Sequence, residues 1–546
     1  MRLFKKRQPV SSEYTRKEGT YHTKNQERPA RKSWWQHKRT RIAVIIVLTI
    51  VAIILITIVP LIIIRQIQLA KANDAHRAVP PPLSDPDSDA TTTETSPVST
   101  PPDPYDDSAQ ANIHVPPLNQ SFHYTSTPIR GINLGGWLVL EPFITPSLFE
   151  QAPDPSKKPD DRHDTKDRVA LDEWTLCQRL GPFRSRELLE HHYDTFITES
   201  DFKTIREMGF NHVRIPIGHW AIRPLAREPF VPYVSWTYLL RGIQWARKYG
   251  LRVMVELHTA PGSQNGWNHS GRSGEIRFLN GENGQLYAED TMRVVKDIVT
   301  FFNTNPKDDS SEKQGGNAWS HVVPIFGVLN EPAMMTIKKE DAKQWYRDSY
   351  AAIRNITGSQ KGPVLSYHEG FLGLTPWKDF FKGFDRVILE THMYLIFNPY
   401  LVYMEREKQA AFPCDTWRSQ LSESTRDVAP TMVGEFSYAT NDCGKYLNGV
   451  GYGNRYENTM DGGDSKCTDC NCTEINDWTS WTSEYKSFLN TFIQHQMDAY
   501  EAGVGWFFWT YKTEQHINPH WDYSLAWEQG FAPKDVNKRD FSCDKL

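Results

Sequence analysis

Cysteine is scarce in this 546-residue chain, which has seven cysteines, all between positions 177 and 543. Cys467, Cys470 and Cys472 are spaced closely enough to suggest a zinc site, but no matching group of histidines accompanies them. We therefore expect no metal, and no cofactor is indicated. The odd number of cysteines leaves at least one thiol unpaired, and Cys177 is the expected one.

The chain also lacks a strong overall charge, because its formal net charge at pH 7 is only −4. This balance conceals a basic segment, residues 1–41, where 13 Lys and Arg against three Glu give +10 and leave −14 for the remainder. Such a tail can bind nucleic acid. The hydrophobic run that follows it gives a better explanation, so no nucleic-acid partner is expected.

The one long hydrophobic run, residues 42–64, has 23 residues and no charge. About 20 apolar residues cross a bilayer. A cleaved secretory signal, the alternative, would have a shorter apolar region of about 7–15 residues and small residues before a cleavage site. We expect an uncleaved transmembrane signal-anchor helix in the cell membrane, with the basic tail in the cytoplasm and the rest outside, a single-pass type II topology.

Residues 65–120 are rich in Pro, Ser, Thr and Asp and have little to bury, which predicts an extracellular stalk before a folded domain, residues 121–546. Sequons for N-glycosylation begin at four positions on the predicted outer side: Asn119, Asn268, Asn355 and Asn471. Disulfides are expected in the same location. Topology, cysteines and sequons together indicate an extracellular glycoprotein domain.

From residue 130 onward, short apolar and β-branched runs alternate with amphipathic stretches of helical period. The runs are 130–134, 211–217, 251–258, 322–329, 363–368, 386–394, 431–436 and 504–511, and the helical stretches include 201–208, 238–249 and 484–502. Alternation of strand and helix predicts a parallel sheet. Eight such units predict an α/β fold, a (β/α)₈ TIM barrel with insertions.

Polar side chains lie in or just after these runs, at the end of the barrel where enzymes of this fold build active sites. In chain order they are Arg214, His258, Asn330, Glu331, His368, Glu369, His392, Tyr394, Glu435 and Trp509. One charged strand end could be a structural ion pair. Functional groups on seven strands in register favour a catalytic site.

Glu331 and Glu435 are the candidate catalytic carboxylates. Hydrolysis of a glycosidic bond needs one carboxylic acid to protonate the leaving oxygen and a second carboxylate that acts on the anomeric carbon or on a water. Pro332 fixes the backbone after Glu331, and Asn330 is placed to bond a sugar hydroxyl. Asn-Glu-Pro on the fourth strand with a Glu on the seventh is far more specific than either Glu alone.

Over about residues 128–546 the sequence resembles glycoside hydrolase family 5 and, within it, the fungal exo-β-1,3-glucanases. The segments that carry the resemblance are 130–150 (RGINLGGWLVLEPFITPSLFE), 211–217 (NHVRIPI), 258–266 (HTAPGSQNG), 329–332 (LNEP), 392–394 (HMY), 434–437 (GEFS) and 505–514 (GWFFWTYKTE).

The resemblance implies a retaining mechanism in which Glu435 is the nucleophile and Glu331 the acid/base. Arg214 would keep Glu435 ionised, and His392 and Tyr394 would orient the nucleophile and contact the sugar. Because Glu331 must begin protonated, its pKa is expected to lie above that of Glu435.

The resemblance also implies sugar contacts and disulfides. The sugar-binding residues would be Glu141, His258, Asn330 and Trp509, with an aromatic pair at the cleft entrance, Trp267 and Phe397, which could instead be packed in loops. The family's bridges suggest Cys414 with Cys543, and Cys443 with Cys467, Cys470 or Cys472. The catalytic domain is expected to be monomeric.

Departures from the family pattern concern the substrate. His269 stands where the glucanases have an Asn that contacts substrate, Trp267 replaces Phe, and Glu256 replaces Asp. These changes leave the linkage and chain-length preference open, while the fold and the retaining mechanism are unaffected.

Three functions are weighed on this basis. The first is an exo-β-1,3-glucosidase that releases glucose from the non-reducing end of cell-wall β-glucan at the cell surface. The second keeps the catalytic pair but acts on β-1,6- or mixed-linkage glucan or as a transglycosylase. The third, an inactive glucan-binding surface protein, is disfavoured because both carboxylates and Arg214 are present.

Overall fold

The computed structural model describes residues 105–154, 168–303, 319–398, 400–460 and 470–545. The predicted cytoplasmic tail (1–41), the predicted transmembrane helix (42–64) and most of the predicted stalk lie outside these residues. Among the helices within them, none is long and apolar enough to cross a membrane.

Eight parallel strands close into a barrel in chain order, which confirms the predicted (β/α)₈ architecture. Seven strands lie inside the predicted runs, and the first begins one residue earlier. The strands are β1 (Ile129–Asn133), β2 (His212–Ile217), β3 (Arg252–Leu257), β4 (Ile325–Gly327), β5 (Val364–His368), β6 (Val387–His392), β7 (Thr431–Glu435) and β8 (Gly505–Phe508).

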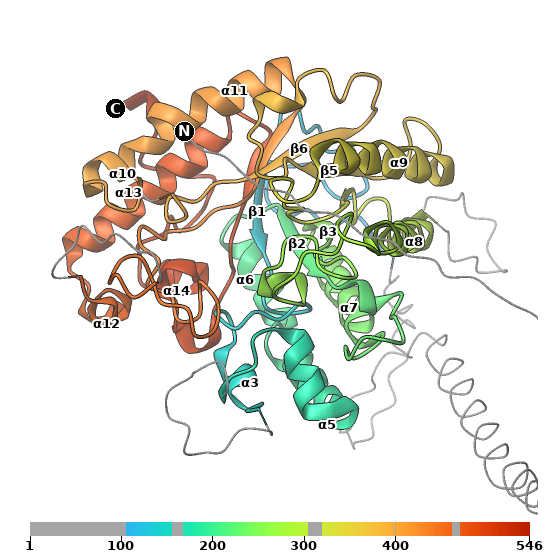
Figure 1. Ribbon diagram of the computed structural model, residues 1–546. Coiled ribbons are helices and arrows are strands. Elements are labelled where there is room, and N and C mark those ends of the chain that lie inside the picture. Colours follow the sequence, from blue (N-terminus) through green and yellow to red (C-terminus); the bar gives the residue numbers. More distant parts are fainter. Residues whose placement is uncertain (1–104, 155–167, 304–318, 399, 461–469, 546) are drawn as a thin grey trace, which may run out of the picture. The chain divides into compact units, whose positions relative to one another are not determined.

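Helices surround the strands (Figure 1). Those in the described residues are α3 (Pro146–Glu150), α5 (Glu173–Thr195), α6 (Glu199–Glu207), α7 (Val234–Lys248), α8 (Gly284–Asn303), α9 (Lys339–Thr357), α10 (Arg406–Phe412), α11 (Arg418–Asp427), α12 (Cys472–Asn476), α13 (Ser483–Tyr500) and α14 (Tyr523–Glu528). The three predicted helical stretches correspond to α6, α7 and α13. The start of α13 is fixed by Thr482, whose side chain accepts a hydrogen bond from the Tyr485 backbone N–H.

The side chains inside the barrel change from apolar to polar along the strands. An apolar cluster fills one level of the interior and consists of Ile129, Met254, Ile325, Val364, Ile388, Met432, Val504 and Phe507. Two residues beyond Met254 and Ile388, on the same faces of β3 and β6, come Glu256 and Glu390. The two-residue period of a strand therefore places polar groups at the carboxyl end, above an apolar base.

The pairing of β6 with β7 shifts register between Thr391 and His392. Such a bulge re-aims the side chain at which it occurs and is common next to active sites. Here it turns His392 at the mouth of the barrel.

Residues 105–120, which composition places in the stalk, pack on the barrel instead. Ala111, Val115 and Leu118 are buried in its main core, and Arg252 donates hydrogen bonds to the carbonyls of Pro116 and Pro117. The folded part of the chain therefore includes residues before the expected boundary at 121, because a few apolar side chains among the prolines suffice to anchor this segment.

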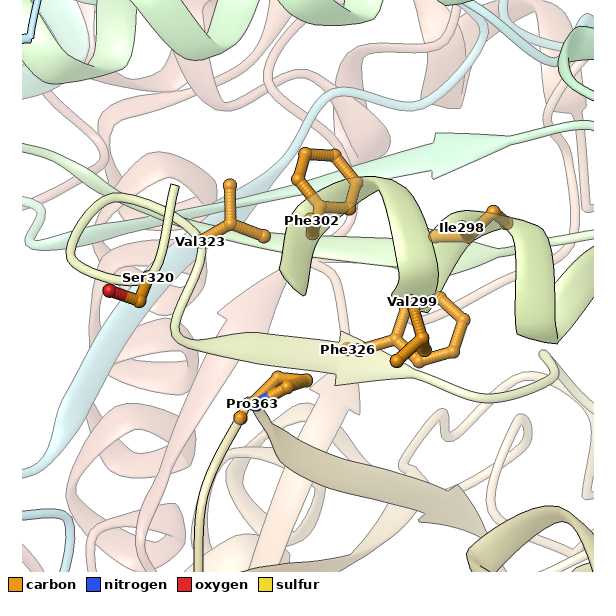
Figure 2. Close-up of a pocket in the computed structure, with 8 residues that line it drawn as sticks. Ile298, Val299, Phe302, Ser320, Val323, Phe326 and Pro363 are labelled. Carbon is orange, nitrogen blue, oxygen red and sulfur yellow. The ribbon is translucent and has the colours of Figure 1, made fainter. Parts of the chain in front are cut away.

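A small cavity of about 30 Å³ lies between α8 and the sheet (Figure 2). Ile298, Val299 and Phe302 of α8 line it opposite Phe326 of β4. It has room for about two waters, and its lining is mostly apolar, with the Ser320 hydroxyl among the lining side chains. This cavity is an imperfection of packing in the helix–sheet layer rather than a binding site.

Two disulfides have both of their cysteines in the described residues. Cys414 pairs with Cys543, as the resemblance implies. Cys443 pairs with Cys472, so Cys467, which lies outside the described residues, is not its partner. Cys177 is free and buried, as the odd cysteine count predicts.

Loss of the Cys414–Cys543 bridge should destabilise the fold more than loss of the Cys443–Cys472 bridge. On the chain-entropy account, a separation of 129 residues gives about 4–5 kcal/mol and one of 29 residues about 3–4 kcal/mol. The measurement is the Tm of the two double Cys→Ser variants, with Cys177→Ser as the control that removes no bridge. A larger loss for the Cys443–Cys472 pair would contradict this account.

Candidate active site

The predicted catalytic residues converge at the carboxyl ends of the strands. Arg214 comes from β2, Glu331 follows β4, His392 ends β6, Glu435 ends β7, and Tyr394 follows β6. Residues from four separate parts of the chain are thereby in direct contact, and the contacts define what each carboxylate can do.

Glu435 is held on both of its oxygens. Arg214 donates from Nη1 to Oε1 at 2.9 Å, and the Tyr394 hydroxyl donates to Oε2 at 2.9 Å. His392 Nδ1 lies 3.5 Å from the same Oε2. These donors orient the carboxylate and stabilise its charge, as a nucleophile requires.

Arg214 is fully buried and serves more than the nucleophile. Its partners are Asn133 Oδ1 at 2.8 Å, Asn330 Oδ1 at 2.9 Å, Glu390 Oε1 at 3.2 Å, Glu435 Oε1 at 2.9 Å and Glu256 Oε1 in a very close pair. Burial alone would lower the pKa of this guanidinium, but the three carboxylates raise it. It is a permanent cation at the centre of the site.

Glu331 lies between two imidazoles. His392 Nδ1 is 2.5 Å from its Oε1, and His269 Nε2 is 3.3 Å from its Oε2. His392 Nδ1 lies near both carboxylates, at 2.5 Å from Glu331 Oε1 and 3.5 Å from Glu435 Oε2, so these two oxygens are at most about 6 Å apart.

The expected order of the two pKa values is not what the substrate-free site shows. Burial raises the pKa of Glu331, but His392 and His269 outweigh it and hold the pKa well below its usual range. Burial raises the pKa of Glu435 against the opposing effects of His392 and Arg214. The prediction was wrong because sequence does not reveal that two imidazoles contact Glu331.

The residues expected to bind the sugar surround this pair. Glu141 is buried, and its Oε1 has no hydrogen-bond partner in the described part of the chain. Burial raises its pKa well above normal, with Glu435 and Glu331 adding to the effect, so it can donate as well as accept. His258 pairs with Glu256 Oε2 at 2.8 Å and stacks on Trp509 at 5.7 Å between ring centroids.

The two predicted entrance aromatics are half exposed, Trp267 at 46% and Phe397 at 49%. Trp267 meets the edge of Phe371 at 5.3 Å, and Phe397 meets the edge of Tyr394 at 5.5 Å. Each ring is supported from one side and open on another, which suits stacking on a sugar better than burial in a loop.

Two residues that complete the site, Glu390 and Asn133, were not predicted from sequence, and His368, predicted only as a polar strand end, joins them. Glu390 contacts Arg214 and His392, Asn133 links Arg214 to the Gly434 carbonyl, and His368 lies beside His392 with 4.4 Å between ring centroids. A signal for Glu390 existed, because it stands two residues before His392 on the same face of β6.

Glu331, His368 and His392 bring potential ligand atoms within 4.8 Å of one another, close enough to consider a metal. His392 Nδ1 already faces Glu331, however, and His368 Nδ1 accepts a hydrogen bond from the Gly370 backbone N–H at 3.0 Å. A cation would have to displace the hydrogen bond between Glu331 and His392. The donor set fits proton sharing better than metal binding.

The sequons differ in accessibility. Asn119, Asn355 and Asn471 are exposed, whereas Asn268 is half-buried beside Trp267 at the mouth of the site. All four remain candidate glycosylation sites, and three are sterically open.

Comparison with known proteins agrees with this geometry. The model of the cellulase family, glycosyl hydrolase family 5, matches residues 181–487. The chain is 41% identical over 455 residues to a probable glucan 1,3-beta-glucosidase D of Aspergillus terreus (strain NIH 2624 / FGSC A1156), covering 80% of this chain and 50% of that protein. It is 40% identical over 451 residues to glucan 1,3-beta-glucosidase D of Emericella nidulans, covering 80% and 50%.

The chain thus spans about half the length of the curated relatives it matches. Among solved structures, a rutinosidase from Aspergillus niger matches with a TM-score of 0.54 and 18% identity, covering 75% of this chain and 98% of that one. That likeness shows a shared fold.

The contribution of His392 to stability should depend on pH. Burial lowers its pKa, but Glu435 and Glu331 raise it from 6.5 to about 10. A raised folded-state pKa stabilises the protein fully below the unfolded value, about 6.5, and the stabilisation is lost as pH rises towards 10. The Tm difference between wild type and His392→Gln should therefore be larger at pH 6 than at pH 10. A difference that does not change with pH would contradict the assignment of a charged imidazole.

Proposed function

Because the chain belongs to the cellulase family, glycosyl hydrolase family 5, we propose that it is a retaining exo-β-1,3-glucosidase that releases glucose from the non-reducing end of β-glucan. The observation that carries the proposal is the Glu331–Glu435 pair, bridged by His392 at 2.5 and 3.5 Å. That bridge limits one oxygen of each carboxylate to at most about 6 Å from the other, which is compatible with the spacing of about 5–5.5 Å between the carboxyl groups of retaining enzymes.

In the first step, Glu435 attacks the anomeric carbon and forms a glycosyl-enzyme ester while Glu331 protonates the departing glycosidic oxygen. Arg214 and Tyr394 hold the attacking carboxylate in position. The proton that Glu331 gives up is drawn from the coupled group of Glu331, His392 and Glu435. The short contact between His392 and Glu331 provides a route from the imidazolium to the carboxylate.

In the second step, Glu331 takes a proton from water, which attacks the ester and releases the sugar with its original anomeric configuration. Consumption of the Glu435 charge by the ester removes one negative partner of His392. His392 and His269 then stabilise the charge of one carboxylate, Glu331, which suits its role as base.

The exo-β-1,3 preference is supported by the printed names of the relatives, glucan 1,3-beta-glucosidase D. A second candidate keeps the same pair but acts on β-1,6- or mixed-linkage glucan, or transfers the sugar to another sugar. Two residues that differ from the glucanase pattern favour this second candidate: His269 beside Glu331 and Trp267 at the mouth of the site. Both lie where a leaving sugar would be bound.

An inactive glucan-binding protein is the different-class alternative. Sugar binding alone requires neither two adjacent carboxylates nor a buried Arg that is hydrogen-bonded to one of them. The complete set of contacts at Glu331 and Glu435 therefore speaks for catalysis.

We further propose that the enzyme is anchored at the cell surface by residues 42–64, with residues 1–41 in the cytoplasm and the catalytic domain outside. Two disulfides and three exposed sequons suit an oxidising, extracellular environment. Its action there would be remodelling or degradation of cell-wall glucan.

The test is hydrolysis of laminarin, lichenan and pustulan by the purified protein, with the product anomer followed by NMR. We expect laminarin to be the best substrate and β-glucose to be the first product. An α-anomer as first product would overturn the retaining mechanism, and a preference for pustulan would support the second candidate.

Matched substitutions test the pair. Glu435→Gln should reduce kcat by several orders of magnitude, because the nucleophile is lost. Glu340→Gln, an exposed carboxyl in the first turn of α9, should retain activity. Full activity of Glu435→Gln would remove the basis of the proposal.

A further inference from the structure

The orientation of the Glu331 carboxyl depends on two rings rather than on its own backbone. The backbone φ of Glu331 is +46°, an unfavourable value for a residue with a side chain. Pro332 follows and restricts the peptide further. His392 Nδ1 is hydrogen-bonded to one carboxyl oxygen at 2.5 Å, and His269 Nε2 lies 3.3 Å from the other.

His269 is kept at this place by a tightly bonded loop. It lies in η3 (Asn268–Ser270), which ends at Gly271 with a φ of +81°. The Ser270 hydroxyl lies 2.6 Å from Ser263 Oγ and 2.7 Å from the Trp267 carbonyl. The loop therefore fixes the position of the imidazole.

The two rings differ in charge. Both nitrogens of His392 face carboxylates, Glu331 and Glu390, so this ring is a cation. Burial lowers the pKa of His269 to about 4, although Glu331 opposes the effect, so this ring is neutral at ordinary pH. Its role must therefore be that of a neutral hydrogen-bonding group.

The surroundings of His269 also select its tautomer. Nδ1 is buried and has no hydrogen-bond partner within the described residues. A buried N–H without an acceptor is rarer and costlier than a buried acceptor without a donor. The ring proton is therefore best placed on Nε2, which lies 3.3 Å from Glu331 Oε2.

We propose that His269 is a positioning residue for the acid/base: its neutral imidazole donates Nε2–H to Glu331 Oε2, fixes the carboxyl between two rings and stabilises its ionised form. This inference rests on the proposed function, since it assigns His269 to the proton-transfer steps. It favours the second step, in which Glu331 acts as base, and it limits the pH at which Glu331 still carries the proton needed in the first.

Other charged or titratable groups face Glu331 and His269 from the neighbouring strands and loops. They are Glu141, Arg214, Glu256, His258, His368, His392, Tyr394 and Glu435. Substitution of His269 leaves all of them in place, so a difference between variants reports on the imidazole.

The experiment compares kcat/KM against pH for the full chain, His269→Leu and His269→Asn on laminaribiose. Both substitutions keep the sequon at Asn268 intact, so glycosylation does not confound the comparison. Loss of the donor destabilises the carboxylate and raises the pKa of Glu331. The alkaline limb of the kcat/KM profile of His269→Leu should therefore move to higher pH by about one unit, the effect of one hydrogen bond to a carboxylate. His269→Asn keeps an N–H donor and should move less.

A substrate that needs no acid provides the second measurement. The 2,4-dinitrophenyl β-glucoside has a leaving group that departs unprotonated, so the variants should show no difference in their alkaline limbs with it. If His269→Leu does not fold, His269→Phe, a ring without nitrogen atoms, replaces it.

An unmoved alkaline limb on laminaribiose, with the same loss of kcat/KM on both substrates, would overturn the role assigned to His269 and leave a substrate contact only. Failure of the proposed function looks different. In that case the wild type hydrolyses neither substrate, or Glu331→Gln cleaves laminaribiose at the wild-type rate.

Discussion

The rest of the site depends on the contacts that the buried guanidinium of Arg214 makes. Arg214 lies on β2 and contacts side chains on or just after five other strands: Asn133, Glu256, Asn330, Glu390 and Glu435. Its contacts therefore join six of the eight strands. Removing one partner from a buried, charged network typically costs about 3–5 kcal/mol, because the charge that remains is left uncompensated. Arg214 therefore couples the closure of the barrel to the position of the nucleophile.

The charges at the mouth of the barrel explain how two carboxylates can have different roles. Arg214 and His392 supply two cations, whereas Glu256, Glu331, Glu390 and Glu435 supply four carboxyl groups. Burial raises the pKa of Glu256 to about 8 in spite of Arg214, and Arg214 and His392 lower the pKa of Glu390 to about 2 against its burial. A site with more carboxyls than cations keeps protons at neutral pH, and these protons belong to the group rather than to one residue. Such a store of protons suits the acid/base role that we propose for Glu331.

The barrel and the convergence of Glu331 and Glu435 at its mouth could be predicted from sequence because they depend on local patterns: eight apolar runs, and polar residues where those runs end. Glu390 and Asn133 were missed because they lie inside strands and read as part of an apolar run, although they face the interior beside Arg214. The expected pKa order of Glu331 and Glu435 was wrong because the pKa of Glu331 is lowered chiefly by His392 and further by His269, two rings that the fold brings to Glu331 from positions 61 and 62 residues away in the sequence. The predicted end of the stalk at residue 120 was wrong for a related reason. Ala111, Val115 and Leu118 are anchored only by a surface that the rest of the fold creates.

The central claim is that Glu435 forms a covalent bond to the sugar while Glu331 handles the proton. The most direct measurement is trapping with 2,4-dinitrophenyl 2-deoxy-2-fluoro-β-glucoside followed by peptide mass spectrometry, because fluorine slows hydrolysis of the ester more than its formation when the leaving group is good. The account predicts one fluoroglucosyl group on the peptide that contains Glu435, with time-dependent loss of activity. A label on Glu331, or full turnover of natural substrate with no adduct at saturating reagent, would contradict it.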